Sequence, residues 1–271
     1  MGSVPLVVGG FSKLFLKAGC REVRVAGLPE FLDKLNKDRG VLTISNHVSV
    51  VDEPFMWGSI PLRNFTNPKT LRWTLGASDM MFNGKLDSWF FRKGQVIETF
   101  RGKGIYQSAI DLASRKLDDG NWVHIFPEGK IKQEELHDLR RFKWGISRIL
   151  MECERMPLIV PVWIKGFEQV MDEPRVSPHF IPNRGKDITI LYGEPLNDSI
   201  TTLVDEYRER FPQGWRPQTY DRNVGEDLEV EPEGLADLRS RIAARLRVGL
   251  MDLGKETAQV ERLPPSKIVG W

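Results

Sequence analysis

Apolar and polar residues alternate along the chain in blocks that predict strands and helices in turn. Short apolar runs rich in β-branched residues, such as 41–44 and 158–164, are typical of buried strands. The expected strands are 22–25, 41–44, 71–75, 95–98, 122–126, 158–164 and 187–191. The expected helices are 11–17, 29–38, 85–91, 104–117, 144–153, 199–210 and 235–250. Strands that alternate with helices predict an α/β fold with a largely parallel central sheet flanked by helices.

The polar loop after the strand at 41–44 places His47 five positions before Asp52. Asp52-Glu53-Pro54 is typical of a helix start, because acidic residues and proline are both favoured in the first turn. Five positions along one helix would put the two side chains on different faces, but across a strand, loop and helix they can meet. An aspartate that holds one imidazole nitrogen makes the other nitrogen a general base. The alternative is a loop histidine and a helix-capping aspartate that do not touch, and the spacing alone leaves both open.

The apolar run 122–126 ends in Pro127-Glu128-Gly129-Lys130, so it also delivers polar groups at the carboxyl end of a strand. Open α/β sheets build their sites at these strand ends. Gly129 allows close approach of the backbone to a ligand, and Lys130 offers positive charge to a phosphate. The alternative is a simple turn that leaves a strand.

Taken together, these two motifs resemble those of the glycerolipid acyltransferase superfamily, which carries Asn-His-x-x-x-x-Asp and then Phe-Pro-Glu-Gly. Here Asn46-His47 and Asp52 are followed about eighty residues later by 126–129, and Val160-Pro161-Val162 resembles the fourth motif of the superfamily. Within the superfamily the chain is similar to mitochondrial phospholipid–lysophospholipid transacylases, because Lys130-Ile131-Lys132 stands where Thr-Arg-Ser is usual. The segments that carry this closer similarity are 43–47, 72–74, 120–130 and 141–146, and the resemblance extends from about residue 11 to about residue 196.

This resemblance implies an enzyme that moves a fatty acyl chain from a phospholipid to a lysophospholipid in cardiolipin remodelling. The implied acceptor is monolysocardiolipin, and the implied donor is phosphatidylcholine or a similar lipid. His47 is expected to act as general base and Asp52 to orient it, without CoA, a metal or another cofactor. The expected substrate-binding residues are Asn46, Arg101, Glu128, Gly129 and Lys130.

Arg101 is assigned from the second superfamily motif, a glycine followed by an arginine that contacts glycerophosphate. Gly94 is the candidate glycine, and the interval between the two residues is one position longer than in the common pattern. Arg92 or Lys103 could therefore take the role of Arg101.

Two other functions stay open from the sequence. One is a CoA-dependent 1-acylglycerol-3-phosphate-type acyltransferase of the same fold, which no residue pattern separates from the transacylase. The other is a non-catalytic peripheral lipid-binding protein, which the intact pair of His47 and Asp52 disfavours because a binder needs no base. A net charge of +2 gives no nucleic-acid signature, and Cys20 and Cys153 form neither a disulfide framework nor a zinc pattern.

Membrane contact from one side is expected, because no apolar run reaches the roughly 18 residues that a spanning helix needs. The segment 4–17 is apolar with lysines on one side, and Trp89-Phe90-Phe91 precedes Arg92-Lys93. The alternative for both segments is packing against the core. The expected membrane-contacting residues are Leu6, Val7, Phe11, Leu14, Phe15, Trp89 and Phe90. The expected partner is an anionic membrane surface, and the resemblance implies peripheral attachment to the inner face of the mitochondrial outer membrane or the outer face of the inner membrane.

The sequence divides into four expected parts. Residues 1–20 form an amphipathic membrane-associating segment, and residues 21–212 form the acyltransferase domain. Residues 213–234 are polar and rich in proline and glycine, so they are expected to form an exposed loop. Residues 235–271 form a C-terminal helix and a tail whose end, from residue 262, is expected to be loose.

Overall fold

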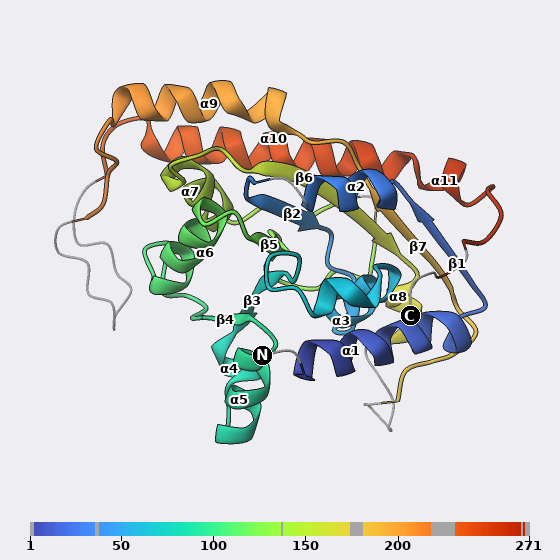
Figure 1. The fold of residues 1–271 in the computed structure, drawn as a ribbon. Helices are drawn as coiled ribbons and strands as arrows, with labels where there is room; N and C mark the ends of the chain where they lie inside the picture. Colours follow the sequence, from blue (N-terminus) through green and yellow to red (C-terminus); the bar gives the residue numbers. More distant parts are fainter. Residues whose placement is uncertain are drawn as a thin grey trace.

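A seven-stranded sheet runs through the centre of the molecule in the order β1-β7-β6-β2-β5-β3-β4 (Figure 1). The computed structural model describes residues 3–35, 38–136, 138–173, 181–217, 231–266 and 268. The strands are β1 (Glu22–Ala26), β2 (Val41–Ser45), β3 (Trp73–Ala77), β4 (Val96–Thr99), β5 (Trp122–Ile125), β6 (Leu158–Lys165) and β7 (Asp187–Tyr192). Neighbouring strands are parallel except β6 and β7, which are antiparallel. The largely parallel α/β fold is confirmed, and every expected strand lies within two residues of its observed bounds.

Helices follow the strands as expected from the periodicity of the sequence. The α-helices are α1 (Ser3–Leu14), α2 (Leu28–Leu35), α3 (Asp52–Met56), α4 (Ser78–Met81), α5 (Lys85–Lys93), α6 (Ser108–Asp118), α7 (Gly145–Glu152), α8 (Phe167–Val170), α9 (Asn197–Arg210), α10 (Leu235–Lys255) and α11 (Thr257–Val260). A π-helical turn, Phe15–Gly19, follows α1, and 3-10 turns lie at Trp57–Ser59 and Leu62–Phe65. The sequence did not predict α4, α8 and α11, because four residues are too few to show a helical period.

Two hydrophobic layers cover the two faces of the sheet. Side chains of α6, α7, α9 and α10 form the core on one face, and side chains of the π-helical turn, α2 and α3 form the core on the other. Figure 1 shows α9 and α10 side by side along one side of the molecule, with α1 on the opposite side. Helix α10 buries Leu238, Ile242, Leu246 and Leu250 at a spacing of four residues, so one of its faces belongs to the same core as the sheet. The expected boundary between the acyltransferase domain and the C-terminal helix stays a prediction, and α10 packs against α9 and β6 of the expected acyltransferase part.

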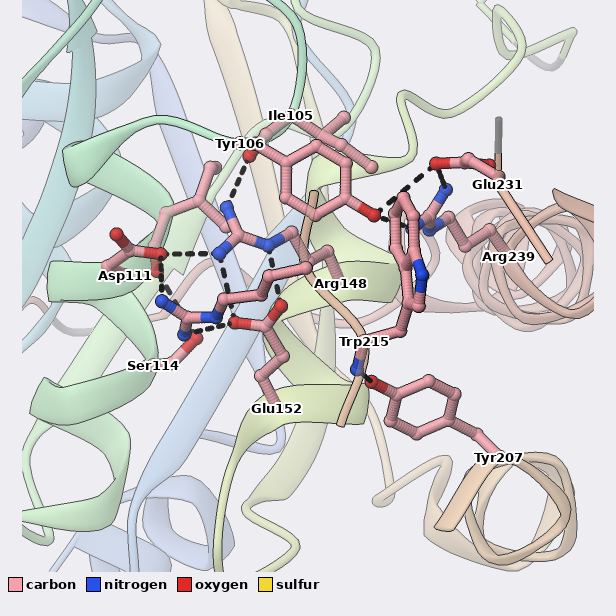
Figure 2. A network of polar contacts seen from close by, with 12 residues as sticks. Ile105, Tyr106, Asp111, Ser114, Arg148, Glu152, Tyr207, Trp215, Glu231 and Arg239 are labelled. Atoms are coloured by element: carbon pink, nitrogen blue, oxygen red, sulfur yellow. Dashed lines mark hydrogen bonds and ion pairs between the residues drawn. The ribbon is translucent and has the colours of Figure 1, made fainter. Parts of the chain in front are cut away.

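Within the expected exposed loop at 213–234, residues 218–230 lie outside the described residues. The described residues that flank this segment are anchored to the core. Trp215 packs against the core of α6, α7 and α10, and Glu231 forms an ion pair with Arg239 of α10 (Figure 2). The same network contains Arg148 of α7, whose guanidinium pairs with Asp111 of α6. One end of the loop is therefore fixed by the packing of Trp215 and the other by an ion pair to the buried Arg239, which the polar composition did not reveal.

The C-terminal tail is not loose in its described part. The backbone N–H of Ser266 donates to the oxygen of Val23 at 2.7 Å, and the side chain of Arg24 donates to the oxygen of Leu263 at 2.9 Å. The tail expectation was wrong there, because β1 is an edge strand whose unpaired backbone groups bind the passing chain. Residues 269–271 lie outside the described residues.

Two expectations for the N-terminal segment are corrected by the structure. Phe15 is buried rather than available to a membrane, because its ring stacks on Phe55 of α3 with centroids 4.4 Å apart. Lys13 is also buried, and this burial lowers the pKa of its amine to about 8. The change from an α-helix to a π-helical turn at Phe15 alters the helical phase, which the sequence pattern did not predict. The other expected membrane residues are exposed: Leu6, Val7, Phe11 and Leu14 of α1, and Trp89 and Phe90 of α5.

Candidate active site

The loop that carries His47 leaves the carboxyl end of β2, which lies between β5 and β6 near the middle of the sheet. All five residues of β2 are buried. The side chain of Asn46 donates to the oxygen of Ile164 at 2.8 Å and accepts from its N–H at 2.9 Å. Asn46 thereby continues the pairing of β2 with β6 by one position and fixes the start of the loop. The geometry therefore gives Asn46 a positioning role, and its expected contact with substrate stays a prediction.

His47 and Asp52 meet, which decides between the two geometries that the spacing left open. Nδ1 of His47 lies 2.9 Å from Oδ2 of Asp52. The same oxygen accepts from the backbone N–H of Val48 at 2.6 Å and of Ser49 at 2.7 Å, so the carboxylate also shapes the loop. Because a carboxylate accepts at Nδ1, that nitrogen carries the proton and Nε2 is left as the basic nitrogen. The catalytic roles of the two residues stay predictions.

Asp52 is fully buried at the start of α3, whereas the side chain of His47 keeps 21% of its surface exposed. Burial raises the pKa of Asp52, and the hydrogen bonds from His47, Ser49 and Val48 act in the opposite direction. The exposed side of the imidazole is the side from which a substrate hydroxyl can reach it. This is the usual division between a reacting histidine and the carboxylate that orients it.

The ring of Phe126 lies against His47, a contact that the sequence did not indicate. The two rings stack with centroids 4.2 Å apart and an angle of 19° between their planes. Phe126 is the last apolar residue before the Pro-Glu-Gly turn, so only its place beside a motif could have singled it out. The face of an aromatic ring attracts a cation, so Phe126 can stabilise His47 once it is protonated.

Glu128 joins the turn after β5 to the His47 loop. Its side chain is buried, and Oε1 accepts from the N–H of His47 at 3.1 Å while Oε2 accepts from the N–H of Arg140 at 2.8 Å. A further bond runs from the N–H of Lys132 to the oxygen of His47 at 2.8 Å. Burial raises the pKa of Glu128, against the hydrogen bonds from the two backbone groups. Both carboxylate oxygens are engaged with the backbone, so the geometry gives Glu128 a positioning role, and its expected contact with substrate stays a prediction.

The expected phosphate ligands lie in different surroundings. Gly129 and Lys130 are exposed on the turn after β5, and Gly129 has a φ of 67°, a left-handed conformation that glycine adopts without strain. Arg101 follows β4 at the edge of the sheet and forms an ion pair of 3.4 Å with Asp79. Among the described residues, no hydrogen bond or ion pair joins Arg101 to the His47 loop.

Arg92 and Gly94, which were considered for the second motif together with Lys103, make local contacts. Arg92 pairs with Glu98 at 2.6 Å, and the oxygen of Gly94 accepts from Arg72 at 3.1 Å. Arg72 also donates two hydrogen bonds, of 2.6 and 2.7 Å, to Glu53. Glu53 is the residue that follows Asp52 in α3. Sequence reasoning included Arg72 only as part of a family-like segment, and the structure shows that it braces α3.

A second buried polar group, His124, lies beneath the His47 loop and was missed from the sequence. Nδ1 of His124 lies 2.9 Å from the hydroxyl of Thr43, its partner across β2 and β5, and Trp122 donates to the same hydroxyl at 2.8 Å. Burial and the nearby charges of Arg72 and His47 lower the pKa of His124 well below its usual value. His124 is therefore neutral and supports the packing under Phe126, whose ring it meets edge-on at 4.6 Å.

Within the described part of the chain, no group of three His, Cys, Asp or Glu side chains is arranged to hold a metal ion. No described helix combines the length and the apolar character that a membrane span requires.

Comparisons with known proteins identify the family of the chain. Residues 29–165 match the acyltransferase family. Tafazzin of Saccharomyces cerevisiae is 32% identical over 97% of this chain and 80% of its own length. Tafazzin of Drosophila melanogaster is 40% identical over 84% of this chain and 60% of its own length. The crystal structure of the 1-acyl-sn-glycerophosphate acyltransferase PlsC from Thermotoga maritima is also similar, with a TM-score of 0.54 and 16% sequence identity. The match covers 92% of this chain and 78% of the PlsC chain, and at this identity it supports the fold alone. The mitochondrial transacylases that the four segments resemble are the tafazzins, and this chain belongs to the tafazzin family of phospholipid–lysophospholipid transacylases, which are acyltransferases.

Proposed function

We propose that His47 and Asp52 carry out the transacylation by general acid–base catalysis, without CoA. Nε2 of His47 takes the proton from the free hydroxyl of a lysophospholipid while that oxygen attacks the ester carbonyl of a donor phospholipid. The tetrahedral intermediate then collapses, the bond from the carbonyl carbon to the donor oxygen breaks, and His47 returns the proton to that leaving oxygen. The acceptor gains the acyl chain, and the donor leaves as a lysophospholipid.

The observation that carries this proposal is the contact of 2.9 Å between Nδ1 of His47 and the buried carboxylate of Asp52. Asp52 keeps the proton on Nδ1 and stabilises the imidazolium that forms during the reaction. Stacking of Phe126 on His47 supports the same charged state. A protein that only bound lipid would have no use for this arrangement.

The proposed substrates are monolysocardiolipin as acceptor and phosphatidylcholine or a similar phospholipid as donor. Lys130, exposed beside the His47 loop, is proposed to bind a lipid phosphate, and Gly129 leaves room for the headgroup. Arg101 is proposed to contribute from the edge of the sheet, with the ion pair to Asp79 as a competitor. The proposed setting is a mitochondrial membrane facing the intermembrane space, which the protein contacts from one side.

The proposed membrane contact is supported by exposed apolar side chains on α1 and α5, two helices that touch each other. Exchanging Val7 of α1 for serine is expected to weaken flotation with anionic vesicles. The matched control is Val248→Ser, because Val248 is also exposed but lies on α10, on the other face of the sheet. Equal flotation of the two variants would contradict this orientation.

The transfer reaction is tested with purified protein, a phospholipid labelled in its acyl chain and an unlabelled lysophospholipid, with and without CoA. Transfer of label without CoA supports the transacylase. Transfer that needs acyl-CoA would indicate the CoA-dependent alternative, and lipid binding without transfer would indicate the non-catalytic one.

A further inference from the structure

Three cationic residues, Lys130, Arg140 and Lys143, have their backbone at the turn after β5. The chain returns to this turn after residue 137, since the N–H of Arg140 donates to Oε2 of Glu128 at 2.8 Å. The N–H of Lys143 donates to the oxygen of Pro127 at 2.8 Å. These bonds fix both backbone positions next to the turn. All three cationic residues are exposed there.

The side chain of Lys143 runs along Gly129. Its Cγ and Cε lie 3.5 and 3.8 Å from the position that a Cβ would take on Gly129. Because Gly129 has no side chain, the aliphatic part of Lys143 can pack over this turn. A larger residue at position 129 would compete with a ligand for this space.

The carboxylate of Glu128 places this cluster next to the proposed base. One oxygen accepts from the N–H of His47 at 3.1 Å, and the other accepts from the N–H of Arg140. The carboxyl group of Glu128 therefore bridges the backbone of His47 and the backbone of Arg140. Burial raises the pKa of Glu128, while the charges of His47 and Arg140 both act to lower it.

The three cationic residues differ from the neighbouring Lys132 in their ion pairs. Lys132, on the same segment, pairs with Asp138 at 3.2 Å and with Glu135 at 3.7 Å. For Lys130, Arg140 and Lys143, no ion pair with an acidic side chain occurs among the described residues. Glu128 is the acid beside this cluster, and one carboxylate leaves an excess of positive charge among the three cations. Such an excess next to a reacting group favours an anionic ligand.

We infer that Arg140 and Lys143, together with Lys130, bind the phosphodiester of the acceptor lipid and hold its free hydroxyl at His47. This inference rests on the proposed transacylase function and names the residues that select its acceptor. The guanidinium of Arg140 can bind two phosphate oxygens, and the two amines add point charges. An acceptor with two phosphates offers this cluster more charge than a lysophosphatidylcholine does.

The inference is tested with Arg140→Gln, Lys143→Gln and the double variant. The matched control is Arg141→Gln, because Arg141 is also exposed on this segment but its guanidinium lies 5.8 Å from the ring centre of Trp144. Glutamine keeps the backbone bonds that fix the segment, so melting temperatures should match that of the wild type. Each test variant should raise the apparent KM for monolysocardiolipin roughly tenfold with little change in kcat, as expected for lost charge-assisted binding. The control should stay within about twofold.

Two measurements distinguish binding at this cluster from general attraction to an anionic membrane. Flotation with phosphatidylcholine vesicles that contain phosphatidylglycerol should be equal for Arg140→Gln, Lys143→Gln and Arg141→Gln, because general membrane attraction does not depend on the cluster. Calorimetric binding of a short-chain lysophospholipid below its micelle concentration reports the site without turnover, and Kd should rise only for the test variants. If Kd rises no more for the test variants than for Arg141→Gln, the inference is overturned. The proposed transacylase function would still stand in that case, provided that the wild type transfers the acyl chain and His47→Ala does not. Absence of transfer in the wild type with intact selective binding would overturn the proposed function and the acceptor role, and would leave only an anion site.

Discussion

The turn after β5 and the loop after β4 both follow strands of the same sheet, and both carry a cation that the sequence predicts as a phosphate ligand. The turn after β5 is bonded to the His47 loop through Glu128 and Lys132. The loop after β4 instead makes local contacts, among them the bond from the N–H of Phe100 to Gln107 at 2.9 Å, and Arg101 forms an exposed ion pair of 3.4 Å with Asp79. The cause is the order of the strands, because β5 lies next to β2, whereas β4 is an edge strand that pairs only with β3. A residue at the carboxyl end of a strand can therefore be assigned to the site only when it is known which strands lie next to that strand.

The largest effect is expected from His47→Ala at the central strand ends. Loss of the general base should lower kcat on the order of 10²–10⁴-fold. The fold should persist, because the side chain is partly exposed in a loop and packs mainly against Phe126. Acyl transfer and melting temperature are measured on the same preparation. Wild-type transfer by a folded variant would rule out the proposed mechanism.

Asp52→Asn should be nearly as damaging, with a loss in kcat on the order of 10²–10³-fold. Asparagine can still accept from the backbone of Val48 and Ser49, but it removes the charge that stabilises the imidazolium of His47. Melting temperature should change little, because asparagine has the same shape as aspartate and keeps an oxygen that accepts from the loop backbone. A parallel loss of melting temperature and activity would instead make Asp52 a structural residue.

Glu128→Gln should weaken the connection between the two central loops. Glutamine has one side-chain oxygen, so the N–H of either His47 or Arg140 loses its acceptor, at a cost of about 1–3 kcal/mol. Melting temperature should fall by several degrees, and displacement of His47 should reduce kcat about tenfold or more. Glu135→Gln is the control, since Glu135 is an exposed acid on the adjoining segment. Equal behaviour of the two variants would show that the bridge does not position His47.

Much of the fold followed from the sequence because its signals are local. The runs at 41–44 and 158–164 are apolar and β-branched, and they became β2 and β6 within one residue. The motif spacing also brought attention to His47 and Asp52, although it left open whether they touch. Their contact required the short helix α3 to begin at Asp52, so that the carboxylate reaches back to the loop.

The missed features depend on contacts between distant parts of the chain. Phe15 is buried because Phe55 of α3 stacks on it, and no helical pattern in the first twenty residues contains that information. Glu128 reaches the N–H of His47, 81 positions earlier, and this bond exists only because β5 and β2 are neighbours. The motifs therefore predicted which residues lie at the site. The order of the strands determined that one of them, Glu128, positions another, His47.

The smallest effect is expected at the sheet edge, and it tests the comparison directly. Arg101→Gln and Lys130→Gln remove one charge each from exposed side chains, so both should affect KM more than kcat. Because Arg101 is partly compensated by Asp79, its loss should raise the apparent KM for monolysocardiolipin only about two- to threefold, compared with roughly tenfold for Lys130→Gln. Asp79→Asn frees Arg101 without touching it, and this variant should leave the KM unchanged or slightly lower it. A larger effect of Arg101→Gln than of Lys130→Gln would place the phosphate nearer β4, and the strand order would then be the wrong guide to the groove.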